Sequence, residues 1–450
     1  MISRRDFIKA SVLSLSSINP LKALYSQSKA KSLVHIFYVG GPSQIELFDY
    51  KPDLYKYHNK TINHFKSEKG QKGGVLKKPV SIFKKAGNSG MWLSDLIPHM
   101  HKHADDITLI KTVQAQSLNH IFAQNELLTG SIFADTSSFG SWINYLRGGK
   151  NSFIPQELIL PDALGAPRCS PQCFSTQLEF NRSFLEFEDF KALQSLYLRS
   201  HFKKKDEIDT FSHYLKKFNQ NSGHLQRRDQ IRQHQELEFQ LKSFHRLNEF
   251  LKGAPSQREQ KLYNIRKYGE NALADKLLFT KYSLKKGAPF VQIMIGNEDD
   301  PTSWDHHFNI NDILTMTKKS DFLISAFLSD IKEEGLSEDT IILGAGEFGR
   351  TPITDEGLDK PKGISTWGRG HNKYLNSVWL MAPGLKKGFT YGESDNLSLF
   401  CDQNPVSIAD LWYTLFHLLG IDGHKVESVK KGRILRPNFK HGNLVREILS

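Results

Sequence analysis

Residues 33–42 read LVHIFYVGGP, and this stretch decides the fold class. An almost unbroken apolar run that Gly-Gly-Pro ends indicates a strand buried on both faces. Comparable runs recur at 107–113, 157–160, 290–296, 340–346 and 377–381. Strands of this kind belong to parallel sheets that helices cover on both faces. We therefore predict an α/β domain with a mostly parallel sheet sandwiched by helices.

Helical spacing separates these strands. It predicts helices over residues 93–103, 119–128, 311–334 and 404–419. Between about 183 and 286 the composition changes to long stretches rich in Lys, Arg, Gln and Glu, with apolar positions that suit one face of a helix. We interpret residues 29–450 as one domain that carries a basic α-helical insertion at about 183–286.

Composition narrows the class of protein. The chain has 450 residues, 39% of them hydrophobic, which excludes wholesale disorder. Its 3 cysteines cannot form a disulfide framework. It has no run of about 18 uncharged apolar residues, so we expect no transmembrane segment.

The net charge of +12 lies mainly in one region. Residues 199–286 hold twenty basic and ten acidic residues, so the rest of the α/β core is close to neutral. The basic helices either present a solvated face or meet acidic polymer or lipid headgroups.

The N-terminus resembles a twin-arginine export signal. Residues 3–9 read SRRDFIK, and a short, mildly apolar stretch follows at 10–24. We expect residues 1–28 to be this signal peptide and the protein to be periplasmic or otherwise exported; the alternative is a disordered basic tail. Export and the lack of a recognisable nucleic-acid module argue against a nucleic-acid partner.

Polar side chains cluster next to the predicted strands. In an open parallel sheet, ligands bind beyond the carboxyl ends of the strands. Carboxylates and imidazoles are ligands for zinc, manganese or iron, and arginine matches the geometry of phosphate or sulfate. A shared polar site is therefore predicted, with Ser43, Gln44, Glu46 and Asp49 after the first strand, Ser117, Asn119 and His120 after the second, Asp305, His306 and His307 after the 290–296 strand, Glu347 and Arg350 after the 340–346 strand, and Arg369 and His371 before the last.

Three motifs stand out in the sequence: GGPSQIELFDYKP at 40–52, WDHH at 304–307 and GEFGRTP at 346–352. They resemble motifs of the bacterial domain of unknown function 1501 family. The resemblance runs from about residue 31 to the C-terminus. The family is grouped with the alkaline phosphatase and sulfatase superfamily, and LLTG at 127–130 resembles the end of the sulfatase nucleophile helix.

This resemblance implies a metal-dependent hydrolase of a phosphate or sulfate ester. The expected cofactor is a divalent metal (zinc, manganese or calcium), and the expected substrate is an anionic ester such as a sulfated or phosphorylated glycan. Arg350 would bind the substrate anion or the developing charge. The resemblance implies Glu46 or Asp49, together with Asp305, His307, Glu347 and His371, as candidate metal ligands, and we expect Ser43, Asn119 and Arg369 to contact the substrate.

The nucleophile departs from the sulfatase pattern. Sulfatase spacing, counted back from the LLTG ending, lands on His120 instead of a Ser, Thr or Cys. His120 would then act as a ligand or base, with water as the attacking group. Ser117 is the nearest hydroxyl alternative.

Other departures weaken the analogy. Gln114, Ala115 and Gln116 stand where relatives commonly have two threonines and an aspartate, and Gly370 stands where they have an aspartate before the histidine. Loss of an outer partner alone can cost about 10–100-fold in metal affinity. The alternative function is therefore a catalytically degenerate relative that binds an anionic glycan or a protein partner.

Overall fold

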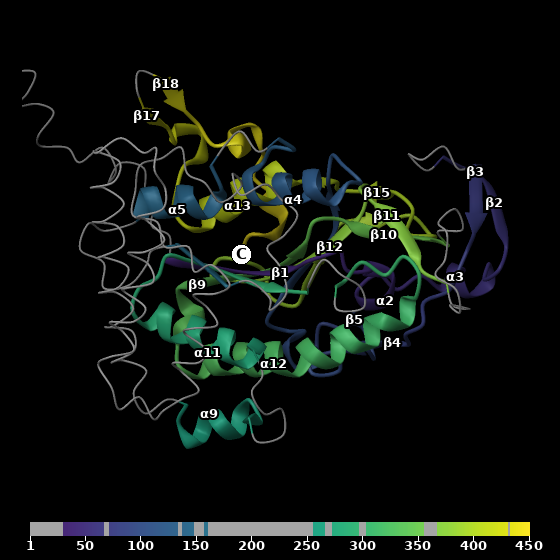
Figure 1. Ribbon diagram of the computed structural model, residues 1–450, viewed down its shortest axis with the longest axis horizontal. Coiled ribbons are helices and arrows are strands. Elements are labelled where there is room, and N and C mark those ends of the chain that lie inside the picture. The colour runs from purple at the N-terminus through teal and green to yellow at the C-terminus, as the bar shows by residue number, and fades with distance from the viewer. Residues whose placement is uncertain are drawn as a thin grey trace, which may run out of the picture.

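The computed structural model describes residues 30–66, 72–133, 137–147, 157–160, 255–265, 272–296, 303–354, 367–430 and 433–450 (Figure 1). The predicted signal peptide and most of the predicted insertion lie outside these ranges. Within them, no helix combines the length and apolarity needed to cross a membrane.

An eight-stranded sheet forms the centre of the described part of the chain. Its order is β13–β6–β12–β9–β1–β8–β7, and β16 also pairs with β6. The strands are β1 (Ser32–Tyr38), β6 (Thr108–Gln114), β7 (Glu157–Leu160), β8 (Phe290–Ile295), β9 (Thr340–Gly346), β12 (Asn376–Met381), β13 (Phe389–Tyr391) and β16 (Val406–Ser407).

Only β12 runs against the others in this sheet. It is antiparallel to β9 and β6, whereas every other neighbouring pair is parallel. The predicted mostly parallel sheet is therefore confirmed. Because β12 is reversed, its amino end lies at the same edge as the carboxyl ends of the parallel strands, so the residues before β12 face the same edge as those after β1, β8 and β9.

Helices cover both faces of the sheet, as predicted (Figure 1). On one face lie α4 (His120–Thr129), α5 (Phe139–Arg147) and α13 (Ile408–Leu418); on the other lie α11 (Ala272–Lys285) and α12 (Ile313–Glu333). Along β1, Leu33 and Phe37 pack into the first layer, and Val34 and Ile36 into the second. The whole strand is buried, which explains its unbroken apolar sequence.

Two predicted helices differ from the structure. Residues 93–103 contain the end of β5 (Met91–Ser94), a turn and the 3-10 helix η2 (Met100–His103). Pro98 disfavours a helix through this segment because it lacks an N–H, and Asp321 of α12 accepts hydrogen bonds from the backbone of His99 and Met100. The predicted helix at 404–419 begins only at Ile408, behind a capping box between Ser407 and Asp410.

Shorter elements surround this core. They are α2 (Gln44–Leu47), α3 (Pro52–Lys56), β2 (Thr61–Lys66), β3 (Lys72–Val75), β4 (Phe83–Ala86), α9 (Gln257–Leu262), η4 (Ile310–Asp312), η5 (Leu336–Glu338), β10 (Gly349–Thr354), β11 (Arg369–Asn372), β14 (Glu393–Ser394), β15 (Cys401–Gln403), η6 (Gly423–Lys425), β17 (Ser428–Lys430), β18 (Arg433–Leu435), η7 (Asn438–His441) and η8 (Arg446–Ile448). Of these, the β10–β11 pair contributes most to the polar edge of the sheet.

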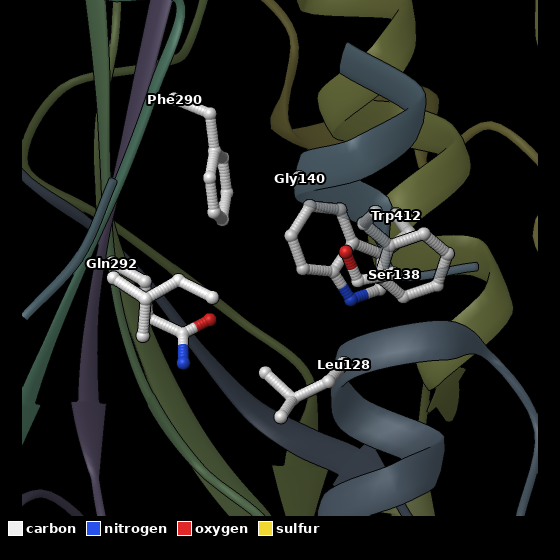
Figure 2. Close-up of a pocket in the computed structure, with 8 residues that line it drawn as sticks. Leu128, Ser138, Gly140, Phe290, Gln292 and Trp412 are labelled. Atoms are coloured by element: carbon white, nitrogen blue, oxygen red, sulfur yellow. The ribbon is translucent and has the colours of Figure 1, made fainter. Parts of the chain in front are cut away.

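A small cavity lies between the sheet and the helices (Figure 2). Phe290 and Gln292 line it from β8, Leu128 from the end of α4, and Trp412 from α13. Its lining contains none of the predicted site residues. It is a packing gap between the sheet and one helical layer, separate from the polar edge of the sheet.

A buried ionic network attaches α9 to the helical layer. The Nζ of Lys281, on α11, lies 2.8 Å from Asp330 Oδ2 on α12, and it also contacts Glu259 of α9. Arg258 NH1 donates to Asp330 Oδ1 at 2.6 Å. The part of the predicted insertion that the structure describes is thus joined to the core by the buried charges of Lys281, Glu259 and Asp330, with the partly exposed Arg258 beside them.

Asp330→Asn tests this network. The substitution leaves Lys281 with one fewer anion in a buried position, so we expect the free energy of unfolding to fall by about 3 kcal/mol. Glu333→Gln is the matched control, because Glu333 pairs with the same Arg258 but its side chain is 60% exposed. It should cost less than about 1 kcal/mol. Urea denaturation of both variants measures the difference, and equal losses would contradict the prediction.

Candidate metal centre

Four side chains meet at the carboxyl edge of the sheet: His120, Asp305, His307 and His371. One donor atom from each lies within 4.8 Å of the others. His120 begins α4, Asp305 and His307 lie between β8 and α12, and His371 lies on β11 before β12. Residues more than 180 positions apart in the sequence are therefore brought together by the order of the strands. We call these residues the four-ligand group.

Glycine at the end of β1 lets the loop that carries Asp305 approach closely. Gly40 has a φ of 111°, and a Cβ there would lie 2.6 Å from the backbone N of Asp305. Trp304 fixes the same loop, since its backbone N donates to Val39 O at 2.9 Å and its ring N–H to Ile295 O at 3.1 Å. A larger residue at position 40 would push Asp305 away from the sheet.

The donor atoms have the spacing of a metal site. His307 Nε2 lies 2.7 Å from His371 Nε2, and Asp305 Oδ1 lies 3.0 Å and 3.3 Å from these two nitrogens. His120 Nε2 lies 3.1 Å from Asp305 Oδ2. Ligands about 2.0–2.1 Å from a tetrahedral zinc would themselves be separated by about 3.3 Å. The spacing of the group thus fits a divalent metal.

The tautomer of His371 supports this fit. Its Nδ1 donates to the backbone carbonyl of Leu118 at 2.6 Å, and a carbonyl oxygen can only accept. Burial, followed by the charge of Arg350, holds the pKa of His371 well below its usual value, so the ring is neutral. The Nε2 lone pair is therefore directed at Asp305 and His307, where a cation would satisfy it.

Glu347 contacts Nδ1 of His120, the ring nitrogen that does not face the other members of the four-ligand group. Its Oε1 lies 2.7 Å from His120 Nδ1, and it accepts further hydrogen bonds from the backbone N of Gly40 and from Gln124 Nε2. A carboxylate on the remote nitrogen of a ligating histidine is typical of metal sites. The structure thus places Glu347, predicted as a ligand, in contact with His120 and outside the four-ligand group.

Arg350 holds the carboxylate of the group in its ionised form. Its NH2 lies 2.6 Å from Asp305 Oδ1. Burial would raise the pKa of Asp305, but the charge of Arg350 and hydrogen bonds from His120 and His307 keep that pKa far below its usual range. The other guanidinium donors bind backbone carbonyls, including those of Gly41 and Arg369. Arg350, predicted to bind substrate, is 1% exposed and is directed at the protein.

Four other predicted site residues form separate buried contacts. Arg369 donates to Glu46 Oε1 at 2.7 Å, and both side chains are fully buried. Ser43 Oγ contacts the other oxygen of Glu46. Asp49 accepts hydrogen bonds from Ser394 and Ser398. The structure therefore brings none of Ser43, Glu46, Asp49 and Arg369 into the four-ligand group.

Ser117 and Asn119 shape the entry to α4. Ser117 Oγ accepts from the backbone N of Asn119 at 3.0 Å, and Asn119 Oδ1 caps the helix by accepting from Ile121 N. Both residues precede His120, and their hydrogen bonds orient the backbone that positions its side chain.

Sequence reasoning missed two participants. Gln124 lies one helical turn after His120, so the (i, i+4) spacing was a usable signal. Leu118 acts through its backbone carbonyl, which carries no sequence signal. His306, by contrast, was predicted as part of the shared polar site and lies outside the four-ligand group; it is 1% exposed, and burial, followed by the charge of Arg350, lowers its pKa to about 3.

The fold and the site together define an α/β domain with a histidine–aspartate cluster at the carboxyl edge of a mostly parallel sheet. A family model described as "Protein of unknown function (DUF1501)" matches residues 30–449, and the chain belongs to this family. The family resemblance of the three motifs is thereby confirmed.

No curated protein matches the chain. Among solved structures, it is similar to the PsFucS1 sulfatase from Pseudoalteromonas sp., with 13% identity, coverage of 92% of this chain and 72% of that one, and a TM-score of 0.36. A protein in the alkaline phosphatase superfamily from Vibrio parahaemolyticus has 11% identity, coverage of 92% and 79%, and a TM-score of 0.39. The alkaline phosphatase from the Antarctic bacterium TAB5 has 12% identity, coverage of 87% and 98%, and a TM-score of 0.37.

Protonation of His120 should contribute measurably to the free energy of unfolding of the metal-free protein. Burial lowers the pKa of His120, but its hydrogen bonds to Asp305 and Glu347 outweigh burial and raise the pKa to about 9. Since the folded pKa exceeds the unfolded value of about 6.5, the added stability is complete below pH 6.5 and is lost as pH rises through 9.

We expect this loss to amount to about 3 kcal/mol between pH 6.5 and 9.5, relative to His120→Gln. Urea unfolding of both proteins at a series of pH values, in the presence of a chelator, measures it. Parallel pH profiles for the two proteins would contradict the prediction.

Proposed function

We propose that this protein is an exported, metal-dependent hydrolase of a phosphate or sulfate ester, with the metal held by the four-ligand group. One observation carries the proposal: four donor side chains from three separate segments converge, and three of them are oriented by a second contact. Those contacts are Glu347 on His120, Leu118 O on His371, and Arg350 on Asp305.

The donor set limits which metal ions the site would bind. Three imidazole nitrogens and one carboxylate suit zinc or manganese better than calcium, which prefers six to eight oxygen ligands. When bound, such a metal supplies Lewis-acid charge to the oxygens of an ester group. The other contributions to catalysis that we propose come from the side chains of this protein.

The local charge favours an anionic substrate. Asp305 and Glu347 contribute two negative charges and Arg350 one positive charge, while His371 is neutral. With neutral histidines and a divalent ion, the centre carries a net charge of about +1, which attracts a phosphate or sulfate group. Glu347 then retains the proton of His120 on Nδ1, so that Nε2 stays directed at the metal position.

Water is the attacking group that we propose. In the described part of the chain, the four-ligand group consists of imidazoles and one carboxylate, and the Oγ of nearby Ser303 is engaged with the backbone N of Asp305 at 3.1 Å. Ser117, the predicted alternative nucleophile, is engaged with the backbone of Asn119. His120 occupies the helix start, where its role is to bind the metal.

A second candidate is a catalytically degenerate protein that binds an anionic glycan or a protein partner. It is favoured by Gly370, which follows Arg369 on β11 and supplies no carboxylate beside His371. Such a protein would keep its metal and its affinity for anions without turning over an ester.

Elemental analysis of protein purified from the native periplasm tests the first proposal. We expect about one divalent metal per chain, and its loss in Asp305→Asn and in His371→Ala. Hydrolysis of p-nitrophenyl phosphate and p-nitrophenyl sulfate should fall at least about 100-fold in both variants. His424→Ala is the matched control, because it removes an exposed histidine of η6.

The results separate the two functions. Absence of stoichiometric metal from the wild type would overturn the metal-dependent hydrolase. Metal without hydrolysis of any ester, together with salt-sensitive binding to a sulfated polysaccharide, would favour the degenerate binding protein.

A further inference from the structure

Glu126 is a buried carboxylate on the helix that begins with His120. It is 3% exposed, and both of its oxygens accept hydrogen bonds from the same residue. The backbone N of Gln116 donates at 2.7 Å and the side-chain Nε2 of Gln116 donates at 2.9 Å. This double contact folds residue 116 back onto α4.

The segment fixed in this way, residues 115–119, connects β6 to α4 and supports two members of the four-ligand group. The Leu118 carbonyl accepts from His371 Nδ1 at 2.6 Å, and His120 follows two residues later. The start of the segment is also held, because the backbone N of Ala115 donates to Lys373 O at 2.8 Å. A shift of this segment would therefore displace His120 and release His371 together.

We propose that Glu126 is a positioning residue for the metal centre. By holding Gln116, it keeps the Leu118 carbonyl on His371 Nδ1, so that His371 Nε2 faces Asp305 and His307. The inference rests on the proposed function, because it presupposes a metal at the four-ligand group. It assigns a task to a side chain that contacts neither the metal position nor a substrate.

The chemistry of the contact explains why a carboxylate fits here. Gln116 presents two N–H donors, and a carboxylate offers two acceptor oxygens at once. A glutamine at 126 has only one acceptor oxygen, and its own N–H group would oppose a donor of Gln116. The amide N–H of a glutamine at 126 would be unsatisfied at a position that is 3% exposed, which costs about 1–3 kcal/mol and is enough to shift the 115–119 segment.

Glu126→Gln tests the proposal through metal affinity. We expect the dissociation constant for zinc or manganese to rise about 10–100-fold, measured by competition with a chromogenic chelator. Nitrogen-15 spectra of the histidine rings should show His371 protonated on Nδ1 in the wild type, and a mixture of tautomers in the variant. A merely structural role for Glu126 would leave this tautomer unchanged.

A double variant provides the rescue. In Glu126→Gln with Gln116→Glu, the new glutamine accepts from the backbone N of residue 116 and donates to the new carboxylate, so the paired contact is rebuilt. Metal affinity should return to within about 3-fold of the wild type. Gln116→Ala is an additional variant on an exposed residue, and it should weaken binding by a smaller factor because it removes only one of the two donors.

The outcomes are distinct. A wild type that binds neither zinc nor manganese overturns the proposed function and this inference with it. A wild type that binds metal, beside a Gln116→Ala or Glu126→Gln variant with unchanged affinity and unchanged His371 tautomer, overturns the positioning role alone. A folded double variant that stays as weak as Glu126→Gln also overturns it.

Discussion

The polar edge of the sheet depends on one buried guanidinium. Arg350 lies on β10, and it binds the carbonyls of Gly40 and Gly41 at the end of β1, Asp305 in the loop after β8, and the carbonyl of Arg369 on β11. A buried arginine is tolerated only when its donors are satisfied and its charge is paired. Three segments must therefore adopt fixed positions around it, and those positions also bring the metal-binding donors together.

The sequence motifs are complementary parts of this arrangement. Gln44, in the first motif, donates to the backbone O of Arg350 and accepts from its backbone N, each at 2.7 Å. Glu46, in the same motif, neutralises Arg369. The 40–52 motif therefore serves to hold β10 and β11, while the residues best suited to bind metal come from WDHH, from the start of α4 and from β11. This division of labour explains why conspicuous carboxylates such as Glu46 and Asp49 lie outside the four-ligand group.

Much of the fold follows from simple patterns. Buried strands such as β1 and β9 are apolar on both faces, and their positions were predictable within a residue or two. The segment around Pro98 was not, because a backbone without an N–H and the carboxylate of Asp321 override the local helical spacing. The direction of β12 was equally hidden, since an apolar run indicates burial but not orientation.

The site was predictable as a set of positions, and less so as a set of contacts. Strand-end placement pointed to Asp305, His307 and His371, because the edge of a parallel sheet gathers such residues. It could not distinguish a carboxylate that faces a metal position from one that faces an arginine, because the partner of Glu46 lies 323 residues away. The contribution of Leu118 is a backbone carbonyl, which any residue could supply.

The pairing of β10 with β11 places Arg350 directly opposite His371, and Gly349 opposite Asn372. Arg350, which holds Asp305, and His371, a candidate metal ligand, are thus cross-strand neighbours in one small antiparallel pair of strands. Backbone hydrogen bonds set their register. Since the entropic cost of closing a loop grows slowly with its length, the chain that joins the two strands can change in length and sequence with little effect on this pairing. The architecture therefore tolerates changes in the length of this connection while Arg350 and His371 keep their register.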